Sequence, residues 1–281
     1  IIFRSASKEL SPILITALKN TIAFIFFIIL FILLDIPFWY SGFNYSDYIK
    51  IIISGSLGMG IADVLFIFSL SKIGANRIAI INCFEPGVIY FFSMIMLGTI
   101  LSFQQFIGFI IVIISMLIIS YEKDLDDIDP KIKKNGMLLQ IMAVIISSFG
   151  IVLIKPVLIN TNNIISTQIW VTVFRLFPGL VVSWIIFLFQ KNKKNLLAPL
   201  KKSNILWKVV ISSGLGTFIA LSFWIVGYTF IEKPPIASIL GQTSVIFITI
   251  LSYIILKEKV TKFRFLIMWV AIIGVLLIII K

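Results

Sequence analysis

The chain has 281 residues, of which 60% are hydrophobic and 13% are charged, and it carries 24 Lys and Arg against 12 Asp and Glu. A water-soluble domain of this length needs far more polar surface, so the composition excludes that class and predicts an all-α, polytopic membrane protein. The absence of His and the presence of one Cys exclude an internal disulfide, most zinc and iron sites and His-based acid–base catalysis.

Nine apolar runs of bilayer length follow one another, and each predicts a membrane-spanning helix. They cover Pro12–Leu34, Ile49–Leu70, Arg77–Leu97, Ser102–Tyr121, Gly136–Leu158, Ile164–Gln190, Ile205–Phe230, Pro235–Leu256 and Lys262–Ile280. The charged stretch Glu122–Asn135 separates the fourth run from the fifth, and the Lys-rich loop Lys191–Asn204 follows the sixth. The opening residues Ile1-Ile-Phe3 resemble the end of one more span, so we expect a tenth helix before them.

The two halves of the chain share a sequence pattern at an offset of 158 residues. Five residues of the first half recur in the second: Ser54, Leu57, Gly58, Ile61 and Ala62 match Ser212, Leu215, Gly216, Ile219 and Ala220. Such self-similarity predicts two homologous repeats, residues 1–121 and 136–281, joined by a linker at 122–135. Because each repeat would hold five helices, an odd number, the second would cross the membrane in the opposite direction to the first, and the repeats would be inverted.

Lys and Arg gather in the loops at one face of the predicted membrane region. Eighteen of the 24 lie there and three in the loops or end at the opposite face, while Lys19, Lys155 and Arg175 lie within spans. This asymmetry predicts that the basic face is cytoplasmic and that Lys281 is outside. We expect the basic loops to contact anionic lipids and not nucleic acid.

Several residues of the second half resemble the EamA-type domain of the drug/metabolite transporter superfamily. They are Pro235, Ile236-Ala237, Gln242, Leu256-Lys-Glu258-Lys, Thr261 and the glycine of Ile273-Gly-Val275, and Glu258 takes the position of the family's turn glutamate. The first half resembles this domain at Asp63, Ser69-Leu70, Gly74-Ala75 and Glu85-Pro86, although Thr99 replaces the turn glutamate.

The resemblance implies ten helices in two inverted repeats around a central cavity, with both termini in the cytoplasm, which is opposite to the charge count for Lys281. It also implies a secondary transporter of small organic metabolites, such as amino acids, working by alternating access. We expect efflux across the cell (inner) membrane of a bacterium or archaeon. The alternatives are a nucleotide-sugar or phosphorylated-metabolite exchanger and a non-transporting subunit of a larger complex. We expect neither enzymatic activity nor a cofactor or metal, and the chain is compatible with a homodimer.

Ionisable side chains are costly in a bilayer core, so each one marks a candidate substrate or proton site. Asp63 lies near the middle of its predicted span, where it could bind a substrate ammonium or a proton, or remain neutral and hydrogen-bonded. Glu85 precedes Pro86, whose ring frees a helical carbonyl near Asn82. Asn82 and Glu85 are three residues apart and share a helical face, so both are candidates.

Four further residues complete the candidate site. Lys155 could bind a substrate carboxylate, pair with Glu85, or extend to the membrane interface. The side chains of Trp224, Tyr228 and Gln242 could shape a cavity and stack on a ligand, or serve packing alone. Lys19 and Arg175 take equivalent positions in the two repeats, which favours a structural role for both, by pairing with a loop carboxylate or a lipid headgroup.

Overall fold

The computed structural model describes residues 9–40, 42–121, 129–161, 164–201, 203–255 and 261–280. Every regular element in these ranges is a helix, which confirms the all-α prediction. The expected span end at Ile1–Phe3, the acidic part of the linker, the family turn at Glu258 and the terminal Lys281 lie outside the described residues.

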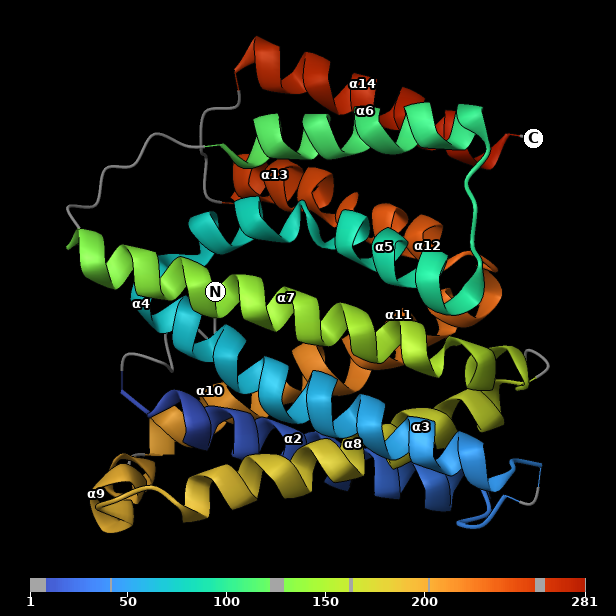
Figure 1. Ribbon diagram of the computed structural model, residues 1–281. Helices are drawn as coiled ribbons and strands as arrows, with labels where there is room; N and C mark the ends of the chain where they lie inside the picture. The colour runs from blue at the N-terminus through green and yellow to red at the C-terminus, as the bar shows by residue number, and fades with distance from the viewer. Residues whose placement is uncertain are drawn as a thin grey trace. The chain divides into compact units, whose positions relative to one another are not determined.

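The helices follow the apolar runs along the chain (Figure 1). The elements are α2 (Pro12–Leu33), α3 (Tyr45–Gly55), η1 (Ser56–Ala62), α4 (Asp63–Asn82), α5 (Glu85–Leu97), α6 (Phe103–Ser120), α7 (Pro130–Ile159), α8 (Ile165–Leu188), α9 (Lys193–Leu197), η2 (Ala198–Lys201), α10 (Ser203–Ser213), η3 (Gly214–Ile219), α11 (Ala220–Phe230), α12 (Pro234–Gln242), α13 (Ser244–Ile255) and α14 (Lys262–Ile279).

Seven helical stretches in the described residues are long and apolar enough to cross a membrane. They are Pro12–Leu33, Tyr45–Ala75, Arg77–Leu97, Phe103–Ser120, Pro130–Ile159, Ile165–Leu188 and Ile205–Phe230, and Phe265–Ile279 is a shorter apolar helix. The eighth expected run is divided at Thr243 into α12 and α13, so neither piece alone reaches bilayer length. The count of nine spans and the inverted arrangement of the repeats stay predictions.

Local capping residues decide where several spans begin. The side chain of Asn44 accepts a hydrogen bond from the backbone of Asp47, whose carboxylate accepts one from the backbone of Asn44. This capping box starts α3 at Tyr45, four residues before the first residue expected from hydropathy. Asp129 caps α7 in the same way, with Pro130 at its first position, so the basic end of the predicted linker is helical and not a loop.

The chain forms two compact units, and each unit takes elements from both sequence halves. The first unit comprises Ile1–Ala75 and Ile128–Glu232, and the second comprises Asn76–Asp127 and Lys233–Lys281. The boundary near Ala75 lies at a kink in α4, where Gly74 has φ 75° and ψ 173°, a backbone conformation that favours glycine. The boundary after Ala75 and the boundary after Glu232 are 157 residues apart, which is close to the offset of the predicted repeats. Elements that the offset matches therefore belong to the same unit.

In the first unit, α3, α7 and α8 pack against the π-helical segment η1, and α2 packs on α8 and η3. A second π-helical segment, η3, interrupts the helix between α10 and α11. The repeat offset of 158 superimposes η1 on η3, so the two halves share this irregularity. Short π-helical turns inside α-helices occur frequently at functional sites, so the side chains around η1 are candidates for the functional site.

In the second unit, α5 packs on α12, and α6 lies beside α14 (Figure 1). Gly108 and Gly274 allow the close approach of α6 and α14, because a Cβ atom added at Gly274 would lie 3.0 Å from the carbonyl oxygen of Gly108. Gln104 donates hydrogen bonds to the carbonyls of Leu277 and Ile280 at the end of α14. The core of this unit is apolar and includes Cys83, Phe109, Met116, Ile239 and Ala271.

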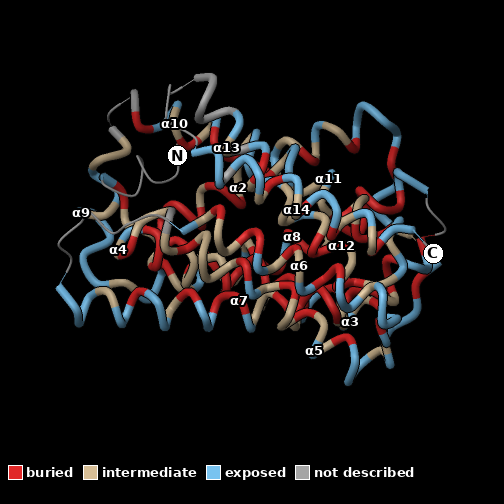
Figure 2. The backbone as a smooth tube through the Cα atoms, turned by 90° about the horizontal axis from the view of Figure 1, so that it is seen from above, coloured by how far each residue is buried: buried red, intermediate tan, exposed pale blue. Residues whose placement is uncertain are grey.

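The helices alternate between buried and exposed residues along their length (Figure 2). On α7 the exposed positions include Leu138, Ile141 and Ile145. Large apolar side chains on an outer helix face would aggregate in water but suit contact with lipid. The apolar outer face and the length of the helices together make the chain an integral membrane protein.

Candidate functional site

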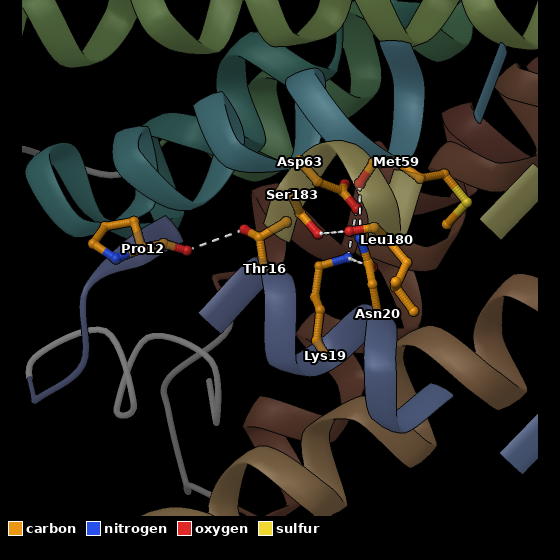
Figure 3. A network of polar contacts seen from close by, with 8 residues as sticks. All are labelled: Pro12, Thr16, Lys19, Asn20, Met59, Asp63, Leu180 and Ser183. Atoms are coloured by element: carbon orange, nitrogen blue, oxygen red, sulfur yellow. Dashed lines mark hydrogen bonds and ion pairs between the residues drawn. The ribbon is translucent and has the colours of Figure 1, made fainter. Parts of the chain in front are cut away.

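Lys19 and Asp63 form an ion pair inside the first unit (Figure 3). Lys19 comes from α2, and Asp63 is the first residue of α4, directly after η1. The Lys19 Nζ lies 2.5 Å from the Asp63 Oδ2 and also donates a hydrogen bond to the Asn20 Oδ1 at 3.1 Å. Asp63 therefore has a cationic partner from another span, and Lys19 pairs with a span carboxylate instead of the loop carboxylate or lipid headgroup that we expected.

The neighbouring amide ties α2 to the π-helical segment. The Nδ2 of Asn20 donates to the carbonyl of Met59 at 2.9 Å, and Figure 3 shows both groups beside the ion pair. A π-helical turn shifts the backbone hydrogen bonds by one residue, so its carbonyls are open to side-chain donors. Asn20 is fully buried, and this contact places Lys19 next to the end of η1, where Asp63 begins α4.

Glycine residues let η1 approach α8 closely. A Cβ atom added at Gly55 would overlap the backbone carbonyl of Arg175. One added at Gly60 would lie 2.7 Å from the Cγ1 of Val182, and one added at Gly179 would lie 2.6 Å from the Cβ of Met59. Two helices without side chains at their crossing can bring their backbones together, so the contact holds α8 and its charged side chain against η1.

Arg175 is buried at this crossing with 3% of its surface exposed. Its Nε donates to the Ser54 Oγ at 2.8 Å, and the Ser54 Oγ donates to the carbonyl of Gly150 at 2.6 Å. The guanidinium carbon lies 5.5 Å from the ring centre of Trp224, which is a cation–π contact. No carboxylate among the described residues lies within 4.0 Å of the guanidinium, so this buried cation has no contact ion pair there, and Asp63 acts on it only from a longer distance.

The predicted aromatic residues lie in the same unit. Trp224 and Tyr228 both belong to α11, and their ring centres are 4.5 Å apart. Tyr228 is buried, while Trp224 is partly exposed and faces Arg175. Of the predicted site residues, Trp224 is therefore the one that contacts Arg175.

Lys155 caps the end of α11 from α7. Its Nζ donates to the carbonyl of Tyr228 at 2.6 Å and to that of Ile231 at 2.7 Å, and 1% of the residue is exposed. The last carbonyls of a helix have no partner within the helix and carry partial negative charge, so an ammonium group satisfies them. In this structure the Lys155 ammonium is therefore bound by backbone carbonyls of the same unit.

Asn82, Glu85 and Gln242 come together in the second unit. The helix breaks between Asn82, which ends α4, and Glu85, which begins α5. Pro86 has no N–H to donate to the carbonyl of Asn82, and the Nε2 of Gln242 donates to it instead at 3.1 Å. Gln242 ends α12 at the second break, before α13, so a residue at one interrupted helix satisfies the backbone of the other.

Glu85 occupies the first turn of α5 and is partly buried. A carboxylate at a helix N-terminus is stabilised by the helix dipole, which suits this position. Within its own unit, no described residue donates a hydrogen bond to Glu85 or forms an ion pair with it. Glu85 therefore retains its hydrogen-bonding capacity next to the break.

Sequence reasoning assigned Lys19 and Arg175 a structural role and did not single out Ser54. The sequence does contain a signal for Arg175, because the second half has no carboxylate at the place of Asp63. In the predicted repeats Lys19 pairs with Arg175, but Leu221 stands opposite Asp63, so only one of the two cations is expected to have a carboxylate at the matching place. Metal-binding groups of three or more Cys, Asp or Glu are not found in the described part of the chain.

The sequence of the chain matches a known family of membrane proteins. The model of the EamA-like transporter family matches two stretches, residues 1–121 and 134–280. Among curated proteins, no sequence matches. A solved structure, described only as the crystal structure of a protein, superposes with a TM-score of 0.70 at 14% identity, over 98% of this chain and 92% of the other. That likeness shows a shared fold.

Proposed function

The chain belongs to the EamA-like transporter family, of the drug/metabolite transporter superfamily, and on that premise we propose that it is a secondary transporter of small organic metabolites. The proposed substrates are amino acids or related compounds, moved outward by alternating access. Members of the family are transporters and not enzymes, and the helices make the chain an integral membrane protein. The proposed location is the cell (inner) membrane of a bacterium or archaeon.

The observation that carries the proposal is the group of charged side chains at η1. Lys19, Asp63 and Arg175 lie within spans, where charges are costly and are usually retained for substrate or ion pathways. They surround a π-helical interruption that recurs at the equivalent place of the second half. Interrupted helices in corresponding positions of two repeats are a pointer to the binding site of a secondary transporter.

In this proposal Asp63 binds a substrate ammonium or a proton by exchanging its partner. Lys19 neutralises Asp63 in the present structure, and a competing cation would replace Lys19 on the carboxylate. Lys19 would keep its hydrogen bond to Asn20 during the exchange, so it would not be left without a partner. Substrate binding and a change in the packing of α2 on η1 would thereby be linked, as alternating access requires.

A second polar group, at the two helix breaks of the other unit, has a proposed part in the same process. Glu85 and Gln242 lie at interruptions where a helix can change direction with little loss of backbone bonding. We assign them to substrate or proton binding as well. The basic loops are proposed to bind anionic lipids, and a homodimer is compatible with this function.

Transport by the purified protein alone tests the proposal. Proteoliposomes are loaded with a water-soluble cell extract, and the compounds that leave are identified by mass spectrometry. We expect at least one small organic compound to leave faster than from protein-free liposomes, and Asp63→Asn to abolish the difference in protein that circular dichroism shows to be folded. If no compound leaves faster, the transport function is wrong and the accessory-subunit alternative gains support.

The exchanger alternative and the direction of transport are tested by two further measurements. Release of a nucleotide sugar or a phosphorylated metabolite in exchange for an external counterpart would support the exchanger alternative instead. Direction is tested in intact cells that overproduce the protein: efflux predicts that the transported compound accumulates in the medium, and accumulation inside the cells would contradict it.

A further inference from the structure

Arg175 is a buried cation without a contact ion pair in the described part of the chain, and the carboxylate that acts on it electrostatically, Asp63, is already paired with Lys19. The guanidinium lies within a span with 3% of the residue exposed, and its nearest polar partner is the neutral hydroxyl of Ser54. Lys19, the other buried cation of this group, is neutralised by Asp63. The group as a whole therefore holds two positive charges and one negative charge, an arrangement that is expensive in a low-dielectric region.

The repeat alignment shows that this imbalance arises from one position. Lys19 and Arg175 lie at similar places in the two halves, 156 residues apart, and the offset of 158 places Leu221 opposite Asp63. The first half thus supplies both a cation and its carboxylate, whereas the second half supplies the cation alone.

The contacts of Arg175 orient the guanidinium and leave most of its donors unused. The Ser54 hydroxyl donates to the carbonyl of Gly150, so its oxygen presents a lone pair to the Arg175 Nε. The Nη groups carry four N–H donors, and none bonds to a described residue. Gly58 has no side chain beside Nη2, where a Cβ atom would lie 3.0 Å away, so the backbone leaves this edge uncovered by a side chain.

From these observations, and resting on the proposed transport function, we propose that Arg175 binds a carboxylate of the transported metabolite through its two Nη groups. A carboxylate carries one negative charge and matches the single excess positive charge, whereas a phosphate ester carries about two at neutral pH. Its two oxygens also fit the planar fork of a guanidinium. Trp224 flanks the guanidinium and packs on Tyr228, so the two rings position the group from the side of α11.

The residue is closed off in this structure, so a metabolite reaches it only when the helices around η1 separate. Binding of the carboxylate would then neutralise the excess charge and favour closure of the helices around it. The free energy of closing would then be lower for the transporter with bound carboxylate than for the empty one. A ligand shifts a conformational equilibrium only through such a difference between the two states.

The test uses the proteoliposomes loaded with cell extract, followed by single purified compounds. Each compound that leaves is tested again beside its primary amide, which has nearly the same shape without the charge. We expect the compounds that leave to be carboxylates, and Arg175→Gln to slow their release about tenfold or more while the slow release of the amides is unchanged. Arg175→Lys keeps the charge and is expected to fall between the two.

Two further variants separate binding from folding. Leu221→Asp is expected to slow carboxylate release, because an internal carboxylate then competes for Arg175, while the thermal unfolding midpoint is maintained or raised. Lys208→Gln is the matched control, since it removes a cation from the solvated pair with Glu9, at 3.7 Å, and leaves release unchanged. Circular dichroism and size-exclusion chromatography check that each variant is folded.

The possible results decide between the two proposals. Release of uncharged, purely cationic or phosphorylated compounds alone would overturn the carboxylate assignment and leave transport intact. So would an equal loss of acid and amide release in a folded Arg175→Gln variant, because that pattern indicates a structural role. A lack of release of every compound from the wild-type protein would instead overturn transport itself.

Discussion

Replacement of Asp63 by Asn should destabilise the protein strongly, because it removes the partner of a buried ammonium group. Lys19 has 6% of its surface exposed, and its two hydrogen-bond acceptors are Asp63 and Asn20. After the replacement, the positive charge would keep only the neutral amide oxygen. Breaking a buried ion pair by removing one partner costs about 3–5 kcal/mol, and the remaining bond to Asn20 puts the expected cost near 3 kcal/mol.

The converse replacement, Lys19→Met, should cost less. The Asp63 side chain is 27% exposed, so the abandoned carboxylate would still be partly solvated, and we expect a loss of about 1–2 kcal/mol. Removal of both partners in Lys19→Met/Asp63→Asn should cost only about 1 kcal/mol, since neither charge is then left buried without its partner. The coupling energy between the two sites, which is the sum of the two single losses less the loss in the double variant, should therefore be about 3–4 kcal/mol.

Equilibrium unfolding of the four proteins in mixed micelles, followed by circular dichroism, measures this coupling. The matched control is the same cycle on Lys208 and Glu9, a pair at 3.7 Å with side chains 33% and 40% exposed, for which we expect less than about 1 kcal/mol. Additive effects of the Lys19 and Asp63 replacements, within about 0.5 kcal/mol, would show that the pair does not couple α2 to α4 and would refute the reasoning.

Four other outcomes are expected. Gly179→Ala should lower the unfolding free energy by about 1–3 kcal/mol, because the added methyl group forces η1 away from α8, and an unchanged unfolding curve would contradict this close contact. Gln242→Leu should cost about 1–3 kcal/mol in the same assay by leaving the carbonyl of Asn82 without its donor, and an unchanged unfolding curve would contradict the assignment. Glu85→Gln should impair release from proteoliposomes while the protein still inserts into membranes, and full release would remove Glu85 from the site. A tag placed at Lys281 should be accessible from outside the cell, as the charge distribution predicts, and a tag that is reachable only from the cytoplasm would favour the family's usual orientation.

The spans could be located from the sequence because a helix that crosses a bilayer needs about 20 apolar residues. This requirement does not depend on which other helices it contacts. The helix ends were less predictable from hydropathy, since they depend on individual side chains. Asn44 and Asp47 start α3 before the apolar run begins, and Asp129 with Pro130 starts α7 within the charged linker. Both signals are local and can be read from the sequence, but a hydropathy average does not contain them.

The candidate residues themselves were also accessible, because a charge or a proline within an apolar run is conspicuous. The prediction that Pro86 frees the carbonyl near Asn82 was a local consequence of the proline ring, and the structure shows that carbonyl bound by Gln242. The identity of the donor was not accessible. Gln242 lies 160 residues away from Asn82, and only the packing of α5 on α12 brings them together.

The sequence by itself determined the helical membrane class, the two-part organisation recognised by the family match, and the positions of the costly charges, because each follows from composition, periodicity or internal similarity along one dimension. Only the tertiary structure decided which of those charges is neutralised. Lys19 and Arg175 are alike in the repeat pattern, yet one lies against Asp63 and the other against Ser54. The physical reason is that the energy of a buried charge depends on the groups within a few ångströms, and these are set by where the helices cross around η1.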